Sequence, residues 1–378
     1  MLLMPFPLLF LVVLGLLSVG LLGGGLYLLW AWWTGVMVGT ATLIASLLLV
    51  ALGLAGRWLV LLLRRPGPDE PTHERGGEAH QIARPGGGEL RVEVYGPPDA
   101  PPIVLTHGSG VDGTVWHDAK RDLAGRFRLI VWDLPGLGLS REPADRDHAL
   151  KVLARDLEAV LALAGGRPAL LLGHSLGGMA TLTFCQLFPD SLGGAVGGLV
   201  LVNTTPTNPV RTTTGRRFFT AAERPLLRPL LHLIIWTAPL AWLGNWLSYL
   251  NGSLHLLNLL TGFAGGETRG RLEFATRFSA RAWPAVVARE ALAMFDYDAT
   301  ATLGAIHVPV LIVAGDTDRQ TIPEASARMR AALPAAELVV LAPAGHMSFL
   351  ERPAAWSAAV GAFAARVLGG ATPRASGR

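Results

Sequence analysis

The chain has 378 residues, 51% hydrophobic and 16% charged, whereas soluble domains typically contain about 25% charged residues; this imbalance indicates that part of the chain lies in lipid. The net charge of +4 comes from scattered arginines, without the interleaved aromatic residues that would favour a nucleic-acid-binding protein. The single cysteine, Cys185, excludes an internal disulfide bond and a cysteine-based metal site.

Two long apolar runs open the chain. Residues 2–33 and 36–56 carry no formal charge, and each is long enough to cross a bilayer as a helix, which takes about 20 apolar residues. Three tryptophans lie near their junction, where an interfacial belt would stand. We therefore predict a transmembrane helical hairpin over residues 1–65. A secretory signal peptide is the alternative, but no basic residue precedes the first run, and the run is too long.

Basic residues set the expected orientation of this hairpin. Arg57, Arg64 and Arg65 follow the second run, and the turn between the runs has no basic residue. Because basic residues favour the cytoplasmic side, we expect the rest of the chain to face the cytoplasm. Residues 66–88 are polar and rich in proline and glycine, which is typical of a linker; we expect it to merge into a first strand.

From residue 89 onward, short apolar runs alternate with helical stretches. The predicted strands are residues 90–96, 102–108, 128–133, 169–175, 198–203, 308–316 and 337–343. The predicted helices are residues 148–164, 176–188, 323–333 and 353–368. The later strands are continuously hydrophobic, as in a parallel sheet that is covered on both faces. The pattern predicts an α/β fold with a mostly parallel central sheet flanked by helices.

The sequence Gly-His-Ser-Leu-Gly at residues 173–177 is the first candidate for chemistry. A G-x-S-x-G match alone is a weak signal, but this one follows an apolar strand and precedes a helix. In that setting a serine lies on a sharp turn with its hydroxyl exposed. Ser175 is therefore the candidate nucleophile. A simple glycine-rich turn is the alternative, and it would leave the other motifs unexplained.

A serine hydroxyl becomes a strong nucleophile when a base takes its proton, and the base must be oriented by a third group. His346 lies in a loop just after the strand predicted at 337–343. Asp316 and Asp318 lie just after the preceding predicted strand. The chain thus supplies a serine, an aspartate and a histidine in that order, with two aspartates available for the third role.

Several segments together resemble the α/β-hydrolase fold superfamily, in the branch that has a cap inserted late in the sheet. They are "HGSG", "DLPGLGLS", "GHSLGG", "GDTD" and "GHMSFLERP". The resemblance implies a hydrolase core at residues 89–206 and 297–370 and a helical cap at 207–296. We expect residues 371–378 to be a disordered tail.

Carried over residue by residue, the resemblance implies that Ser175 is the nucleophile, His346 the base and Asp318 the acid. The acid in this pattern stands three residues after the glycine that ends the strand, here Gly315, which favours Asp318 over the other aspartate. Some members carry the acid after the earlier strand. That place here holds the amide of Asn203, which also supports Asp318.

An oxyanion hole needs backbone N–H donors. We expect one from Leu176, directly after the serine, and one from the loop that follows the strand predicted at 102–108. The resemblance assigns the second donor to Ser109. We expect His107, Gly108 and Gly110 to support this loop.

A second uncharged run lies within the expected cap. After Arg228, residues 229–266 carry no formal charge. The run lies between two strands of one sheet, so a single membrane crossing would separate Ser175 from Asp318 and His346. Two crossings would place several serine, asparagine and histidine side chains in hydrocarbon, which is costly. We therefore predict amphipathic cap helices.

Trp236, Trp242 and Trp246 are our candidates for cap residues that line the substrate site. The apolar middle of the cap is flanked by arginines, a pattern that suits contact with anionic lipid headgroups. The alternative is that these side chains pack on the core and line an acyl pocket. Both interpretations can hold at once.

These observations predict a membrane-anchored serine hydrolase that cleaves a lipophilic carboxylic ester through an acyl-enzyme, with membrane lipids as its surroundings, no nucleic-acid partner, no cofactor and no metal. An acyltransferase, a perhydrolase or a carbon–carbon hydrolase would use the same three side chains. The alternative of another class is a non-catalytic lipid-binding protein on the hydrolase fold.

Overall fold

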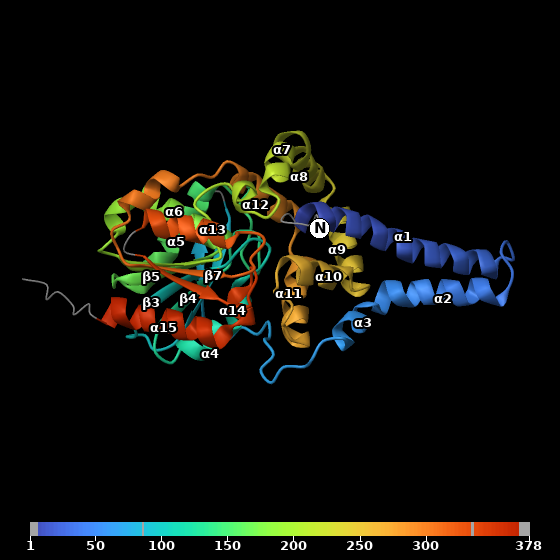
Figure 1. Cartoon of the computed structure of the whole chain (residues 1–378), viewed down its shortest axis with the longest axis horizontal. Helices are drawn as coiled ribbons and strands as arrows, with labels where there is room; N and C mark the ends of the chain where they lie inside the picture. The colour runs from blue at the N-terminus through green and yellow to red at the C-terminus, as the bar shows by residue number, and fades with distance from the viewer. Residues whose placement is uncertain (1–6, 85–86, 334–335, 370–378) are drawn as a thin grey trace, which may run out of the picture.

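The computed structural model describes residues 7–84, 87–333 and 336–369, and its centre is one eight-stranded sheet (Figure 1). The strand order is β1-β2-β4-β3-β5-β6-β7-β8. The strands are β1 (Glu78–Ala83), β2 (Glu89–Tyr95), β3 (Pro102–Thr106), β4 (Arg128–Trp132), β5 (Ala169–His174), β6 (Val196–Val202), β7 (Val310–Gly315) and β8 (Glu337–Leu341). β2 runs antiparallel to β1 and β4, and all other pairs are parallel. The predicted mostly parallel sheet is thus confirmed.

Helices cover both faces of this sheet because its central strands are apolar on both faces. In β3, Ile103 and Leu105 belong to one buried core and Val104 to the other, as the two-residue period of a strand requires. The Val104 face is covered by α5 (Leu150–Leu161), α6 (Leu176–Leu187) and α13 (Pro323–Ala332). The opposite face is covered by α4 (His117–Leu123), α14 (Ser348–Glu351) and α15 (Pro353–Gly369). The tail predicted at 371–378 lies outside the described residues.

The segment predicted as a linker that merges into a first strand, residues 66–88, contains the strand β1 in its second half. Glu78–Ala83 pair with β2 along their whole length. Earlier in the segment, Arg75 forms an ion pair with the buried carboxylate of Asp133 at 2.9 Å. Strand pairing and this ion pair tie the segment to the core.

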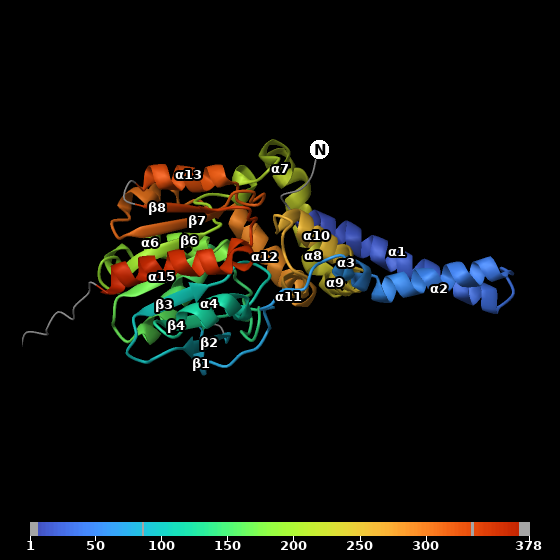
Figure 2. The ribbon, with the colours of Figure 1, turned by 60° about the horizontal axis from the view of Figure 1, so that its bottom comes forward.

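Between β6 and β7 the chain forms helices that lie between the sheet and the N-terminal helices (Figures 1 and 2). They are α7 (Arg216–Ala222), α8 (Arg228–Trp236), α9 (Ala238–Leu250), α10 (Ser253–Thr261), α11 (Arg269–Arg281) and α12 (Pro284–Phe295). We refer to residues 207–296 as the cap. The helical segments on the two sides of Thr237 are bent by 95°, and we call this bend, residues 233–240, the elbow.

Polar side chains in the uncharged run of the cap have partners inside the protein. The hydroxyl of Ser248 lies 2.9 Å from the hydroxyl of Ser18. Nε2 of His255 lies 2.8 Å from a carboxylate oxygen of Glu273. These contacts offset the cost of burying polar groups, so the run forms packed helices despite its mixed composition.

The N-terminal region forms α1 (Pro7–Trp33), α2 (Thr40–Ala55) and α3 (Arg57–Leu62). Among the described residues, one helical segment, Phe10–Trp33, has the length and apolar character to cross a membrane by itself. α2 has 16 residues, fewer than the about 20 that a crossing takes. The first predicted span therefore has a matching helix, whereas the second predicted span corresponds to a shorter apolar helix.

α1 and α2 pack side by side and project beyond the cap (Figures 1 and 2). Gly25 of α1 lies against Val50 of α2, and Gly53 of α2 lies against Leu22 of α1. Positions later in one helix thus face positions earlier in the other, so the helices run antiparallel. The chain therefore returns to the cap before it enters the sheet.

Candidate active site

Ser175 lies between the end of β5 and the start of α6, with φ at 52° and ψ at −118°. A side chain at positive φ is uncommon, and such strained conformations cost about 1–3 kcal/mol. The turn is tight, because a Cβ at Gly173 would clash with the Gly177 carbonyl and a Cβ at Gly177 would clash with the Thr106 carbonyl. Both glycines of the motif are therefore required by packing. They hold Ser175 at the carboxyl edge of the parallel strands.

His346 and Asp318 meet at the same edge of the sheet. Nδ1 of His346 lies 2.9 Å from Oδ2 of Asp318, and both side chains are buried. His346 and Ser175 line one cavity. Asp316 instead accepts a hydrogen bond from the Ala344 backbone N–H at 2.8 Å. The fold thus brings Ser175, His346 and Asp318 together and directs the other candidate aspartate elsewhere.

Asp318 is held by several donors besides His346. The Thr321 hydroxyl donates to Oδ2 at 2.7 Å, the Asn203 amide donates to Oδ2 at 2.8 Å, and the Gln320 backbone N–H donates to Oδ1 at 2.8 Å. Burial acts to raise the pKa of Asp318, but the neighbouring His346 and these hydrogen bonds outweigh it and hold the pKa below its usual value. Asp318 therefore stays ionised and favours the tautomer of His346 with its proton on Nδ1.

Asn203 is part of the site, although in the sequence it served only to exclude an acid at the end of the earlier strand. It lies at the end of β6 with φ at 43°, a region that asparagine tolerates better than most residues. Its amide nitrogen donates to Asp318 and, at 3.2 Å, to the Gly345 carbonyl. Its oxygen accepts a hydrogen bond from the Ser348 hydroxyl at 2.5 Å. Asn203 thereby connects the carboxylate to both sides of the loop that carries His346.

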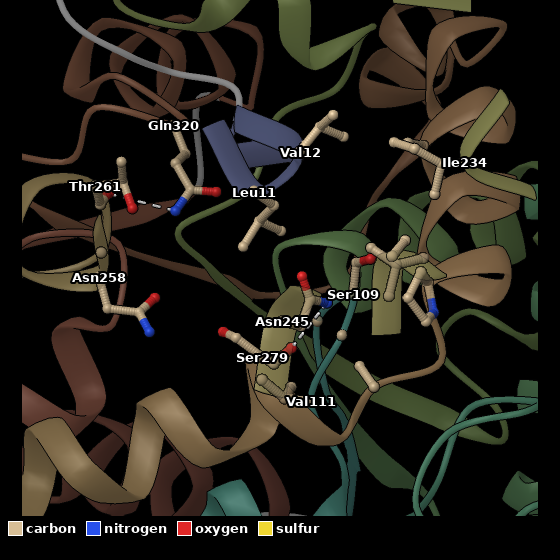
Figure 3. Close-up of a pocket in the computed structure, with 18 of the residues that line it drawn as sticks. Leu11, Val12, Ser109, Val111, Ile234, Asn245, Asn258, Thr261, Ser279 and Gln320 are labelled. Carbon is tan, nitrogen blue, oxygen red and sulfur yellow. Dashed lines mark hydrogen bonds between the residues drawn. The ribbon is translucent and has the colours of Figure 1, made fainter. Parts of the chain in front are cut away.

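A cavity of about 640 Å³ lies in front of Ser175 and His346, a volume that suits a small organic ligand. Its walls come from the loop after β3, the cap and α1, and most of them are apolar (Figure 3). The polar residues labelled in the figure are Ser109, Asn245, Asn258, Thr261, Ser279 and Gln320. Among the described residues, no group of three or more His, Cys, Asp or Glu side chains is placed to hold a metal ion.

The two residues expected to supply oxyanion donors both lie near Ser175. Leu176 is the first residue of α6, so its N–H has no partner in a preceding helical turn. Ser109 lines the cavity. A Cβ at Gly108 would lie 3.1 Å from the Ser175 Cβ, so this loop runs close against the serine. Gly110 has φ at 70°, which glycine adopts without strain.

The two buried histidines near the site have structural hydrogen bonds. Nδ1 of His107 donates to the Gly108 carbonyl at 2.7 Å, and its Nε2 accepts from the Leu134 N–H at 2.9 Å. Burial lowers the pKa of His107, so the ring is neutral and supports the loop, in the place where that role was expected. Nε2 of His174 donates to the His346 carbonyl at 3.1 Å, and burial and the nearby His346 lower the pKa of His174 to about 3.

Glu290 of α12 is a neighbour of the site that the sequence reasoning missed. The Ser109 hydroxyl donates to its Oε2 at 2.5 Å, so the cap reaches the loop that is expected to supply an oxyanion donor. Burial raises the pKa of Glu290 to about 8, although hydrogen bonds from Ser109 and Gly110 partly oppose this. A lone carboxylate among alanines in an apolar helix was the sequence signal that could have identified it.

The three cap tryptophans do not line this cavity, unlike our expectation. Trp236 is 82% exposed. The rings of Trp242 and Trp246 pack against each other with centroids 6.1 Å apart. α9 instead presents Leu240 and Gly244 to the cavity. The two tryptophans are four residues apart and share a different face of the helix, which composition alone could not distinguish.

The chain is similar in sequence to a known family and to several known proteins. Residues 103–360 match the model of the Alpha/beta hydrolase family. A putative carbamate hydrolase, RutD, from Pseudomonas syringae is 27% identical over 70% of this chain and 94% of its own length. A pimeloyl-[acyl-carrier protein] methyl ester esterase from Aeromonas salmonicida is 29% identical over the same shares. The polyketide synthase ThaQ from Burkholderia thailandensis is 33% identical over 75% of this chain, but the chain spans only 13% of that synthase.

Solved structures give the same fold. A putative aryl esterase from Burkholderia cenocepacia has a TM-score of 0.63 at 23% identity, covering 77% of this chain and 100% of its own. A thermophilic esterase from Thermogutta terrifontis has a TM-score of 0.63 at 25% identity, covering 77% and 99%. A bacterial membrane phospholipase A has a TM-score of 0.60 at 23% identity, covering 91% and 97%. This last likeness extends into the N-terminal helices, because the cap and core alone do not amount to 91% of the chain.

Proposed function

The chain belongs to the alpha/beta hydrolase family, and on this premise we propose that it is a membrane-anchored serine hydrolase that cleaves a lipophilic carboxylic ester. The observation that carries the proposal is the 2.9 Å contact between His346 Nδ1 and Asp318 Oδ2 beside the strained Ser175 in one cavity. Strain at a nucleophilic serine on such a turn is the expected cost of exposing its hydroxyl.

In the proposed reaction, the Ser175 hydroxyl oxygen attacks the ester carbonyl carbon while Nε2 of His346 takes the hydroxyl proton. The tetrahedral intermediate collapses, the bond to the alcohol oxygen breaks, and His346 returns the proton to the leaving alcohol. A water molecule then attacks the acyl-enzyme with His346 as base, which releases the carboxylic acid and regenerates Ser175. Asp318 stays ionised throughout and stabilises the imidazolium form of His346.

The backbone N–H groups of Ser109 and Leu176 would stabilise the negative charge that develops on the carbonyl oxygen. Both residues flank Ser175, and neither N–H depends on a flexible side chain. Loss of one such donor typically costs about 3–4 kcal/mol of transition-state stabilisation. The Ser109 side chain is engaged by Glu290, which would keep its N–H directed toward the cavity.

Two features support a lipophilic carboxylic ester as the substrate. The cavity walls contributed by α1 and the cap are largely apolar, so an apolar acyl group gains free energy by leaving water. The relatives include a methyl ester esterase and a putative carbamate hydrolase, and esters and carbamates are both cleaved at a carbonyl carbon. This is the chemistry of the proposed acyl-enzyme.

The membrane part of the proposal concerns α1 and α2. Phe10–Trp33 satisfies the length and hydropathy of a span, and α2 lies antiparallel beside it. We place both helices in the bilayer as a hairpin, with α3 continuing the second helix past Gly56. The catalytic core then stays on the side where α1 begins and α3 ends.

A fluorophosphonate probe tests the proposed nucleophile in the full-length, detergent-solubilised protein. We expect the probe to label the wild type and the control Ser191→Ala, whose serine lies outside the cavity, and to leave Ser175→Ala unlabelled. Hydrolysis of p-nitrophenyl esters should be lost in the same variant. A wild-type protein that binds lipid but neither reacts with the probe nor cleaves any ester would contradict the proposal and favour a binding protein.

A further inference from the structure

The first helix of the chain forms one wall of the cavity that contains Ser175. The lining residues of α1 are Leu11, Val12, Gly15, Leu16 and Val19. Their spacing of three and four residues puts most of them on one helical face. Figure 3 shows Leu11 and Val12 projecting from α1 into the space bounded by Ser109 and Ile234. A helix expected to be a simple anchor therefore bounds the same space as the proposed nucleophile.

This wall is held in place by a close crossing of α1 and α9. A Cβ added to Gly15 would lie 3.3 Å from the Gly244 Cα, so the two backbones are in contact there. One turn further along, the hydroxyls of Ser18 and Ser248 are 2.9 Å apart, and the Asn251 amide donates to Ser18 at 2.7 Å. Small residues and hydroxyl groups at the crossing are the means by which membrane helices associate. These contacts with α9 hold α1 in its position at the cavity.

The exposure of several lining residues points to an opening of the cavity between α1 and the elbow. Leu16 of α1 and Leu240 of α9 both line the cavity, and each is 69% exposed. Leu233 of α8, on the other arm of the elbow, also lines the cavity and is 50% exposed. Trp236, at the bend itself, is also exposed. Exposed apolar side chains gathered around one bend indicate an interaction site, and lipid is the surrounding that would cover them.

The opening lies at the depth of the hydrocarbon layer when α1 spans a bilayer. A crossing takes about 20 helical residues. Counted back from Trp33 at the far end of α1, that length ends near Leu14, so Leu16 falls inside the apolar layer. The described lining residues include no Asp, Glu, Lys or Arg. The opening and the cavity behind it therefore suit an uncharged hydrocarbon chain.

We propose that the acyl chain of a membrane-lipid ester enters this cavity sideways from the bilayer, between α1 and the elbow, and lies against α1 while Ser175 attacks its carbonyl carbon. The inference rests on the proposed function and specifies its substrate class as a long-chain ester that resides in a membrane. α1 is then a determinant of acyl-chain specificity as well as an anchor. An ester dissolved in water would not need this entrance.

Two neighbouring substitutions test the role of α1 in the full-length protein reconstituted in phosphatidylcholine vesicles. Val12→Phe places a larger side chain in the cavity, whereas Val13→Phe, on an exposed face of the same helix, is the matched control. The measured quantity is the ratio of kcat/KM for p-nitrophenyl palmitate to that for p-nitrophenyl butyrate. We expect the ratio to fall about tenfold in Val12→Phe and to stay near the wild-type ratio in Val13→Phe.

The outcomes separate this inference from the proposed function. Equal ratios in both variants and the wild type, with fluorophosphonate labelling of Ser175 retained, would overturn the inference and leave the serine hydrolase intact. A wild type that is not labelled at Ser175 would overturn the proposed function itself.

A second measurement uses the unaltered protein, so it also applies if Val12→Phe does not fold. A phosphonate with a dodecyl chain that ends in a diazirine would be attached to Ser175 in vesicles and then photolysed. We expect crosslinks to the peptide that contains residues 11–19, because the chain lies against α1. Crosslinks that never include α1 would overturn the inference.

Discussion

The carboxylate that orients His346 is selected by hydrogen-bond geometry, because two aspartates follow β7 within three residues of its last glycine. Asp318 binds Nδ1 of His346, whereas Asp316 accepts the Ala344 N–H at the start of the same loop. One aspartate therefore sets the tautomer of the histidine, and the other shapes the loop that carries it.

Substitution of each aspartate by asparagine should separate these two contributions. Asp318→Asn preserves the shape but favours the wrong tautomer of His346, so we expect kcat to fall by about 10³–10⁴-fold. Asp316→Asn keeps an oxygen that can accept the Ala344 N–H, and we expect kcat to stay within a few-fold of the wild type. Steady-state hydrolysis of a short p-nitrophenyl ester measures both. Similar losses in the two variants would contradict the assignment of Asp318.

Glu290 should impose an alkaline limit on activity. With a pKa of about 8, its carboxyl group is mostly neutral at pH 7 and becomes charged above pH 8. A negative charge bonded to Ser109 would then oppose the negative charge on the reacting carbonyl oxygen. We expect kcat to fall as pH rises through about 8, and we expect Glu290→Gln to remove this decline. A decline that persists in Glu290→Gln, while exposed Glu324→Gln behaves as the wild type, would refute this role.

The same titration should appear in the free energy of unfolding. The pKa of Glu290 is raised by burial from 4.5 to about 8, so the neutral form is favoured in the folded state. Its contribution to stability is present below the unfolded pKa and is lost as pH rises toward about 8. Each pKa unit corresponds to about 1.4 kcal/mol. Thermal unfolding should therefore show the wild type losing stability relative to Glu290→Gln across this range.

At the scale of single residues, the sequence was most informative where a motif dictates the chemistry. Ser175, His346 and Asp318 are adjacent to strand ends that an alternating pattern locates, so their meeting at one edge could be predicted. Asn203 and Glu290 could not be assigned, because each acts through a partner far away in the chain. Their roles depend on how the loop after β8 and the cap pack onto the core.

At the scale of elements, the crossing of α1 and α9 is the contact on which the cavity wall depends. A Cβ at Gly15 meets the Gly244 backbone, whereas a Cβ at Gly20 of the same helix meets nothing within 4 Å. A larger side chain can therefore be accommodated at Gly20 but not at Gly15.

Gly15→Leu should therefore displace α1 from the cap, and Gly20→Leu is the matched control. Overpacking at a close contact typically costs about 1–3 kcal/mol. We expect Gly15→Leu to lower the thermal unfolding temperature in detergent and to reduce the palmitate-to-butyrate ratio, with both quantities near wild type in Gly20→Leu. An unfolding temperature that falls equally in both variants would point to a general effect of leucine in α1 and against the crossing.

Elements could be predicted from sequence where the apolar pattern is long. The prediction failed where the outcome depends on which face of a helix a residue occupies. The parallel strands match their predicted ranges to within a residue or two, because continuous apolar runs leave little freedom. Trp236, Trp242 and Trp246 were placed in the cavity on composition, but a helix divides its residues among several faces. β1 was hidden in a polar segment, because an edge strand buries little of its surface.

At the scale of the whole molecule, orientation in the membrane rests on the arginines that follow α2. Arg64 also pairs with Glu267 at 3.4 Å, so part of this charge is used inside the protein. In the proposed hairpin, the antiparallel course of α1 and α2 would put the start of α1 and the catalytic core on one side of the membrane. For that proposed hairpin, the positive-inside tendency would favour the cytoplasmic side for the core.

Because Cys185 is buried and is the chain's one cysteine, single introduced thiols can report this orientation. In a Cys185→Ala background, Lys151→Cys lies on the core and Val38→Cys lies in the turn between α1 and α2. An impermeant maleimide should label Lys151→Cys in sealed inside-out vesicles and Val38→Cys in right-side-out vesicles. The reverse pattern would place the core outside, and labelling of both from one side would exclude the membrane-spanning hairpin.

The contact between Ser18 and Ser248 also has a consequence in time. The two serines are 230 residues apart in the sequence. During synthesis, α1, which forms one wall of the cavity, is therefore completed long before α9, the helix that packs against it. The proposed nucleophile, Ser175, is synthesised between the two. On the proposed function, a nascent copy would lack a complete acyl site until α1 and the cap have met. If α1 is a membrane anchor, as proposed, cleavage of the proposed lipid ester would begin only after that helix has been inserted, and each new molecule would act at its own membrane.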